Sequence, residues 1–418
     1  MDSTTPPPED LVASLSELAV PLPETGALTP RDLPEGLRSR LEAASVVGLG
    51  ESSHGTQEFY DLRARLTRLL VEAFGVRAVG FEAPFHPFCR IDDRVAAGSG
   101  EVRPILAGLD GYRPMRAEPL AELFEWLRSF NASRPAGDRV RVYGYDMTVI
   151  RDAAVGIEPY LDAVGADVDP SLREALGRMT AGYDSEEERR AVLAATRAAT
   201  ESLEPMVEAN EAAWVEAESR REYERVRHRL DLLEGQLEAH ARDHEGRMAL
   251  RDRTMADTVE WIAGRSTGPV ALWGHNGHLN RARHVLEEWD VDVPSMGEQL
   301  DAALGEGYCP VGLETGGGRV AATDFAAGET AEYPIPDPPS GSVPAVLGQV
   351  DGPLFCLSTE ALYADPTVRE WLGTGPRRHD IWGGKPDGGS PVNYLVSELT
   401  TFDWLVFVRD SSPLAHLD

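Results

Sequence analysis

Two short β-branched runs, separated by one helix-length segment, constrain the fold of this 418-residue chain more than any other feature. The first run covers residues 45–50 and the second covers residues 77–82. Between them, residues 56–74 place apolar side chains at helical spacing, and Gly75 then ends the helix as a C-cap would. Two strands joined in this way form a βαβ unit, so we expect them to be parallel.

Further apolar runs extend this unit into a larger sheet. Strands are expected at residues 140–145, 269–273, 309–313, 319–322, 354–357 and 404–408, and helices around Leu106 and at residues 117–130. A long stretch at residues 155–263 is rich in Ala, Glu, Arg and Leu and poor in glycine and proline. We therefore expect an α/β fold: a central, mostly parallel sheet flanked by helices, with an inserted helical lobe and a small C-terminal β/loop elaboration.

The expected organisation has four parts. A Pro-rich peripheral arm covers residues 1–28 and includes one short helix at residues 11–18. The α/β core is divided between residues 29–154 and 264–418, and the helical lobe at residues 155–263 separates its two parts. Residues 328–352 are rich in Pro, Gly and Ser, which predicts a loop or a small β cap, with a lid as an alternative interpretation.

The charge balance excludes two classes of partner. Seventy acidic residues against 40 basic ones give a formal net charge of −30, and Lys385 is the only lysine. A surface this negative repels phosphate backbones and anionic headgroups, so we expect neither nucleic acid nor a membrane as a partner. An acidic excess with arginine in place of lysine also predicts adaptation to high salt, where self-repulsion is screened.

Cysteine usage and hydropathy are those of an ordinary globular protein. Cys89, Cys309 and Cys356 have no CxxC spacing, which predicts small buried side chains and neither a disulfide framework nor a zinc knuckle. The apolar runs are too short to span a bilayer, and the N-terminus resembles no signal peptide. We therefore expect a cytoplasmic protein, and the sequence does not indicate its oligomeric state.

Ionisable residues follow directly after the four clearest strands. They are Glu51 and His54 after the first strand, Glu82 at the end of the second, Asp146 after the third, and His275 and His278 after the fourth. Because ligands bind at the carboxyl ends of parallel strands in α/β sheets, we expect these side chains to line one cleft. The three histidines lie in glycine-flanked turns, where the backbone can come close to a substrate.

Four of these segments resemble the erythromycin esterase family. They are Gly-Leu-Gly-Glu-Ser-Ser-His-Gly at residues 48–55, Phe-Glu-Ala-Pro at 81–84, Tyr-Gly-Tyr-Asp-Met at 143–147 and Trp-Gly-His-Asn-Gly-His at 273–278. With supporting segments at residues 251–256, 295–297 and 402–407, the resemblance covers roughly residues 43–413. It implies an esterase that opens a macrolide lactone with activated water, without a metal or other cofactor, an activity associated with antibiotic resistance.

The resemblance also implies roles for particular residues. His54 would be the general base, assisted by Glu51 and Glu82. Two site arginines, two further cleft histidines and three substrate contacts are also implied: Arg63, Arg251, His275, His278, Asp146, Met147 and Asn276. The chain departs from the family pattern around residues 313–316. This departure puts the family's substrate contacts in question and leaves the implied reaction unchanged.

The residue types suit this chemistry independently of the resemblance. A neutral imidazole with a pKa near ~6.5 can take a proton from water at neutral pH, and a neighbouring carboxylate orients the ring and raises its basicity. The developing oxyanion needs positive charge, which Arg63 or Arg251 could supply. Arg63 lies on the expected helix after His54, where arginine usually faces solvent.

Two alternatives to this function remain open. The same carboxylates and imidazoles could hold zinc or manganese in a metal-dependent hydrolase. The cleft could also hold a ligand such as haem without turning it over. A serine nucleophile is disfavoured, because the sequence around Ser52 and Ser53 is not a Gly-x-Ser-x-Gly elbow, and we expect these serines to cap the following helix.

Overall fold

The computed structural model describes residues 7–109, 113–147, 149–286, 291–324, 328–381, 384–385, 390–396 and 399–417. The chain divides into two compact units. The first consists of Met1–Glu82, Ile91–Tyr143 and Val259–Asp418, and the second of Ala83–Arg90 and Gly144–Thr258.

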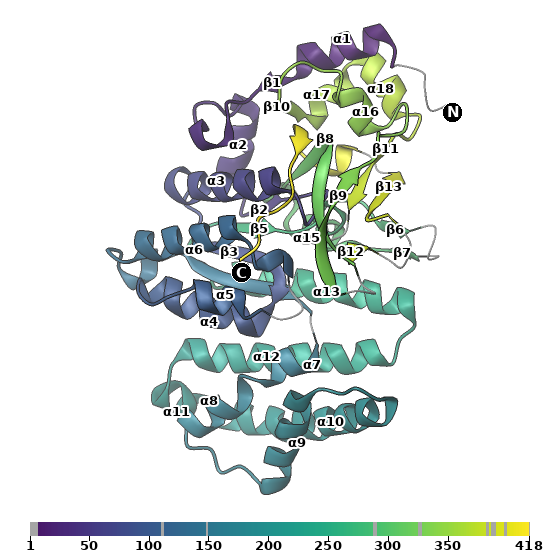
Figure 1. Cartoon of the computed structure of the whole chain (residues 1–418). Helices are drawn as coiled ribbons and strands as arrows, with labels where there is room; N and C mark the ends of the chain where they lie inside the picture. The colour runs from purple at the N-terminus through teal and green to yellow at the C-terminus, as the bar shows by residue number, and fades with distance from the viewer. Residues whose placement is uncertain are drawn as a thin grey trace. The chain divides into compact units, whose positions relative to one another are not determined.

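A ten-stranded sheet forms the centre of the first unit (Figure 1). Its strand order is β1 (Val20–Pro21), β10 (Leu354–Ser358), β14 (Trp404–Ser411), β8 (Tyr308–Asp324), β2 (Val46–Leu49), β5 (Val270–Trp273), β3 (Ala78–Pro84) and β4 (Arg141–Asp146), and β9 (Glu329–Ile335) and β12 (Gly384–Lys385) also pair with β8. Neighbours from β14 through β8, β2 and β5 to β3 are parallel, whereas β1, β10 and β9 run antiparallel to their partners. The expected mostly parallel sheet is confirmed.

One strand differs from expectation. The strands expected at residues 309–313 and 319–322 are a single long strand, β8, because the glycines between them continue the pairing with β14. Gly318 has φ of 113°, and a Cβ there would lie 2.2 Å from the carbonyl oxygen of Ser411. These glycines therefore permit close approach of two backbones and do not form the turn that their composition suggests.

Helices flank this sheet, as their apolar spacing requires. α3 (Gln57–Ala73) follows β2 and buries the predicted apolar face, including Phe59, Leu62 and Leu66. The other helices whose bounds lie wholly or mainly in this unit are α1 (Glu9–Leu18), α2 (Glu35–Ala43), α4 (Phe85–Ala97), α5 (Arg103–Ala107), α6 (Glu118–Asn131), α14 (Asn276–Leu279), α15 (Met296–Leu304), α16 (Val343–Leu347), α17 (Thr359–Ala364) and α18 (Pro366–Leu372).

The terminal parts of the chain pack together. Leu11 and Leu15 of α1 are buried in one apolar cluster with side chains of α16, α18 and β14. The segment at residues 328–352 contains α16 and β9, and β9 pairs with β8 in antiparallel orientation. Two small two-stranded sheets, β11 (Arg377–Ile381) with β13 (Val392–Val396) and β6 (His284–Leu286) with β7 (Val291–Val293), complete the C-terminal elaboration.

The second unit is helical. Its helices are α7 (Ile150–Ala154), α8 (Ile157–Ala163), α9 (Pro170–Ala181), α10 (Glu186–Ala209), α11 (Glu211–Ala217), α12 (Arg220–His240) and most of α13 (His244–Ala263). Side chains of Asp169, Ser185 and Ser219 cap α9, α10 and α12. Within the described ranges, every helix is too short or too polar to cross a membrane.

Candidate active site

The turns that follow β2 and β5 are locked together. A Cβ at Gly50 would lie 2.2 Å from Asn276 Oδ1, so only glycine allows this approach. The backbone N–H of Asn276 donates to the carbonyl oxygen of Glu51 at 2.7 Å, and Asn276 Nδ2 donates to the carbonyl oxygen of Leu313 on β8 at 2.8 Å. Asn276, predicted as a substrate contact, thus joins three adjacent strand ends through the protein's own backbone.

Glu51 lies between a histidine and an arginine. One carboxylate oxygen is 2.9 Å from His54 Nδ1, and the other accepts a hydrogen bond from Arg63. Because the Glu51 carboxylate accepts the hydrogen bond of Arg63, we take it as the acceptor of His54 as well, which places the proton of His54 on Nδ1. His54 Nε2 then carries a lone pair, on a side chain that keeps 20% exposure. This arrangement can take a proton from a water molecule.

The electrostatics of His54 agree with this arrangement. Burial disfavours the charged imidazole, but the hydrogen bond and charge of Glu51, aided by the charge of Glu82, outweigh burial and raise the pKa of His54 above its usual 6.5. The neutral His54 imidazole is therefore a stronger base than a free imidazole.

Arg63 is buried, contrary to the usual position of an arginine on a helix face. Its guanidinium lies 4.5 Å from the ring centroid of Trp273 and 4.6 Å from that of Tyr60. The aromatic rings and Glu51 together stabilise the buried charge. Arg63 therefore balances the charge of Glu51 from within the core.

A second group surrounds Glu82 at the end of β3. One oxygen of its carboxylate accepts the backbone N–H of His275 at 2.7 Å, and the other is 3.4 Å from His278 Nε2. The rings of His54 and His275 are 5.1 Å apart between centroids. The structure thus brings together His54, Glu51, Glu82, Arg63, His275 and His278, which come from four separate segments of the chain.

His275 is held as a neutral hydrogen-bond donor. Its Nδ1 accepts the backbone N–H of Gly277 at 3.2 Å, which places its own proton on Nε2. Burial, together with the nearby imidazole of His54, holds the pKa of His275 well below 6.5. A neutral imidazole with a fixed N–H can donate to a developing oxyanion.

Sequence analysis missed one strand at the site, β11. It brings Asp380 Oδ1 to 3.6 Å from His275 Nε2. The backbone N–H of Ile381 donates to the carbonyl oxygen of Ser52, and His379 Nδ1 lies 2.9 Å from Glu314 Oε1. Residues 377–381 carry four charged or ionisable side chains and no alternation, so their pattern does not predict a strand; an acid within the apolar run of β8, Glu314, is the one available indication.

Ser52 and Ser53 do not cap the following helix. The N-cap of α3 is Thr56, and the helix begins at Gln57. Ser53 Oγ instead accepts the backbone N–H of Gly55 at 3.1 Å. The turn that carries His54 is therefore held by its own internal contacts.

The remaining predicted site residues belong to the second unit. Arg251 binds Asp146 with two parallel hydrogen bonds, from Nε at 2.8 Å and from Nη2 at 2.9 Å. Met147 follows Asp146, and its sulfur lies against Gly235 of α12. Arg251 and Asp146 thus form a bidentate pair, which is the geometry that guanidinium and carboxylate groups prefer.

Four metal-ligand side chains of the predicted site, those of Glu51, His54, Glu82 and His278, contact one another in pairs. His54 Nδ1 faces Glu51, and His278 Nε2 faces Glu82. A cation bound by these four groups would have to replace both pairs, which leaves His54 Nε2 as the most accessible nitrogen for water or metal.

Comparison with known proteins places this chain in a family. The sequence profile of the family described as erythromycin esterase matches residues 71–411. The chain belongs to the erythromycin esterase family. This membership places it among hydrolases.

Relatives in the family are distant in sequence. A Bacillus subtilis (strain 168) protein named as a hydrolase, YbfO, is 24% identical over 382 residues, which cover 83% of this chain and 81% of the relative. Erythromycin esterase type II of Escherichia coli is 26% identical over 319 residues, 68% of this chain and 72% of the relative.

Solved structures of similar fold extend over nearly the whole chain. A Bacillus cereus protein aligns with a TM-score of 0.79 at 20% identity, covering 98% of this chain and 99% of its own. A mutant of the erythromycin esterase EreC in its open conformation aligns with a TM-score of 0.66 at 17% identity, covering 93% and 96%. At these identities the structural likeness concerns the fold of the family.

Proposed function

We propose that this member of the erythromycin esterase family is a carboxylic ester hydrolase that cleaves an ester or lactone with water activated by His54, without a metal. The observation that carries the proposal is the hydrogen bond between Glu51 and His54 Nδ1, which leaves Nε2 as the basic atom of a partly exposed ring. A positioned base of this kind contributes ~10²–10⁴-fold in rate.

The proposed reaction has two steps, the attack of water and the collapse of a tetrahedral intermediate. A water molecule gives a proton to His54 Nε2 while its oxygen bonds to the carbonyl carbon, and the carbonyl becomes an oxyanion. Collapse of this intermediate breaks the carbon–alkoxide bond, and protonated His54 gives its proton to the departing alkoxide. The neutral Nε2–H of His275, beside the His54 ring, is suited to stabilise the oxyanion between these steps.

Macrolide lactones are the first substrate class to test, because one relative is named erythromycin esterase type II. Glu314, at the point where the chain departs from the family, is buried against His379 and supports β11 from inside. Because this departure lies beside the proposed site, simple esters and other lactones belong in the same screen.

The decisive experiment is a substrate screen by mass spectrometry for products heavier by one water. His54→Asn should abolish turnover, because the amide cannot act as a base, and a matched His240→Asn variant in the second unit should retain it. Turnover by the unsubstituted protein should survive a strong chelator. Loss of activity with chelator and recovery with added metal would instead favour the metal-dependent alternative, and retained turnover in His54→Asn would refute the proposed base.

A further inference from the structure

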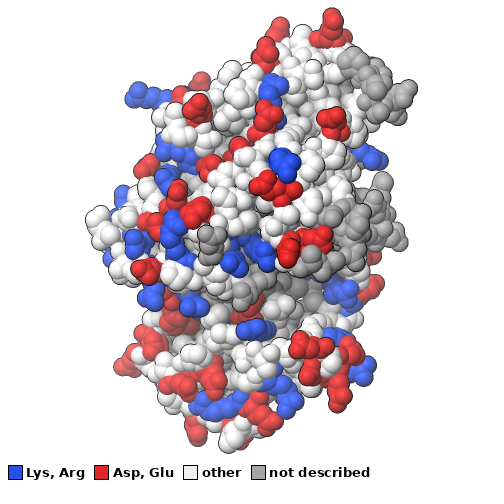
Figure 2. Space-filling view, in the orientation of Figure 1, with Lys and Arg blue, Asp and Glu red and all other residues white. Residues whose placement is uncertain are grey.

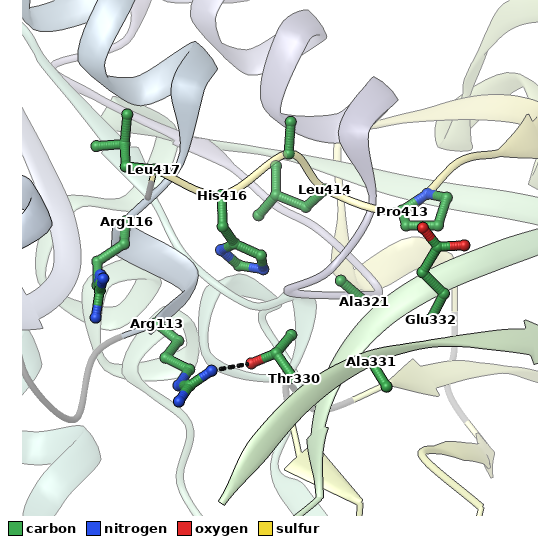
Figure 3. A pocket seen from close by; sticks show the side chains of 11 residues that line it. Arg113, Arg116, Ala321, Thr330, Ala331, Glu332, Pro413, Leu414, His416 and Leu417 are labelled. Carbon is green, nitrogen blue, oxygen red and sulfur yellow. Dashed lines mark hydrogen bonds between the residues drawn. The ribbon is translucent and has the colours of Figure 1, made fainter.

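A pocket in the first unit uses none of the site residues described above. It encloses about 540 Å³ between η2 (Arg113–Met115), the far part of β8, β9 and the C-terminal segment at residues 413–417. Its floor and walls combine apolar groups such as Leu414 and Leu417 with the side chains of Arg113, Arg116 and His416 (Figure 3). This volume is in the range of pockets that hold small organic ligands.

Among the described residues, the groups that bind Arg113 in this pocket are uncharged. Arg113 Nη1 donates to Thr330 Oγ1 at 2.7 Å and Nη2 donates to the carbonyl oxygen of Gly328 at 3.0 Å, and both acceptors are neutral. Within the part of the chain that the structure describes, neither Arg113 nor Arg116 forms an ion pair.

Arginines without an ion pair among the described residues contrast with the acidic excess of this chain, 70 acidic against 40 basic residues. Elsewhere in the same unit Arg103 binds both Glu118 and Glu125. The one carboxylate in the lining, that of Glu332, lies 3.4 Å from Arg319 Nε. Figure 3 shows it on the opposite side of the pocket from the two arginines.

Two hydrogen bonds orient the exposed side chain of Arg113. Two of its N–H groups are held by Thr330 and Gly328 across the pocket edge, which reduces the entropy lost when its remaining donors bind. His416 adds no charge at neutral pH, because burial lowers its pKa and backbone hydrogen bonds to Arg116 and Arg113 offset only part of that effect. The pocket therefore combines guanidinium donors with the apolar side chains of Leu414 and Leu417, and the carboxylate of Glu332 lies on the side away from the arginines.

We propose that this pocket binds a small organic anion, whose carboxylate or phosphate oxygens accept hydrogen bonds from Arg113 and Arg116 while its carbon skeleton packs against Leu414 and Leu417. Guanidinium groups match the geometry of both kinds of oxyanion, and such charge-assisted bonds are about twice as strong as neutral ones. The proposal stands apart from the proposed hydrolysis, since no residue of the Glu/His site takes part.

The pocket wall also holds the turn that carries His54. The carbonyl oxygen of Gly55 accepts the backbone N–H groups of Ala321 and Leu414, both at 3.0 Å, and both residues line the pocket. The next part of the wall is joined to the start of α3, where Ala415 N donates to Gln57 Oε1. The pocket wall is therefore bonded to Gly55, the residue that follows His54. A bound anion should slow hydrogen exchange of the backbone amides in this turn.

Calorimetric titration of the full chain tests the proposal with citrate, inorganic phosphate and acetate as probes. Saturable binding of citrate or phosphate is expected, and comparison of the three probes separates a carboxylate from a phosphate preference. Arg113→Gln/Arg116→Gln should weaken that binding at least about ten-fold. Arg31→Gln, which removes one charge from an exposed arginine of the same unit, should leave it unchanged.

Two further measurements keep the result independent of folding. Thermal melts should show that the double variant and Arg31→Gln unfold alike in the absence of anion. In the unsubstituted chain, citrate should slow modification of Arg113 and Arg116 by phenylglyoxal, as read by mass spectrometry, and leave Arg31 unaffected. Failure of both citrate and phosphate to bind, or equal binding by all variants, would overturn the proposal.

Discussion

Glu51 determines the chemistry of the proposed site because one carboxylate serves both His54 and Arg63. The sequence predicted that Glu51 and His54 act together, since they share one turn after one strand. It could not predict the burial of Arg63, because a helical position does not reveal which face meets the sheet until the packing of Trp273 and Tyr60 is known.

The first prediction at this scale concerns the acid limb of the pH–rate profile. The base must be unprotonated, so kcat/KM should fall as the pH drops through the raised pKa of His54, which lies above 6.5. Glu51→Gln removes the hydrogen bond and charge that raise this pKa, so the midpoint should move to lower pH and the maximal rate should fall by about ten-fold or more. A midpoint unchanged in Glu51→Gln would contradict the assignment.

The second residue-scale prediction concerns stability. Arg63→Met leaves the buried carboxylate of Glu51 without its counter-charge, which should lower the free energy of unfolding by about 3–5 kcal/mol. Denaturant unfolding measures this loss. The double variant Glu51→Gln/Arg63→Met should recover part of it, because it removes both charges, and an additive double variant would show that the pair is not coupled.

At the scale of elements, strands that carry an apolar run were predictable and strands that depend on distant partners were not. β2 and β5 are short buried runs, each followed by glycine-flanked ionisable residues, and both could be located from the sequence. β11 is charged and becomes a strand only through β13, Ser52 and Glu314. Asp380, which β11 brings to His275, therefore escaped prediction.

This dependence gives an element-scale prediction. Glu314→Ala removes the acceptor of both the ring and the backbone N–H of His379, so the backbone amides of β11 should exchange with deuterium at least about ten-fold faster. A matched Glu360→Ala variant, exposed on α17, should leave that exchange unchanged. Equal protection in Glu314→Ala would mean that β13 alone holds the strand.

At the scale of the whole molecule, the charge excess is a property of the surface. The mainly helical second unit and the terminal elements show many carboxylates with arginines interspersed among them (Figure 2). Even if each of the 40 basic residues paired with one acid, 30 of the 70 carboxylates would have no basic partner. The fold was predictable because the spacing of buried apolar residues determines it. The excess of surface carboxylates did not affect that prediction.

The surplus of carboxylates predicts a dependence of stability on salt, and its sign follows from two opposing effects. Salt weakens exposed pairs such as Arg189 with Glu186, but each such pair contributes only about 0–1 kcal/mol. Salt also screens repulsion among the unpaired carboxylates, which are spread over distances comparable with the Debye length of ~10 Å at 0.1 M. Screening should prevail, so the unfolding temperature should rise by roughly 5 °C or more between dilute buffer and molar KCl.

Calorimetry in KCl and in sucrose distinguishes charge screening from a general effect on burial, because sucrose favours burial without screening charge. An unfolding temperature that rises equally in both, or falls in KCl, would show that repulsion among carboxylates does not limit the stability of this protein.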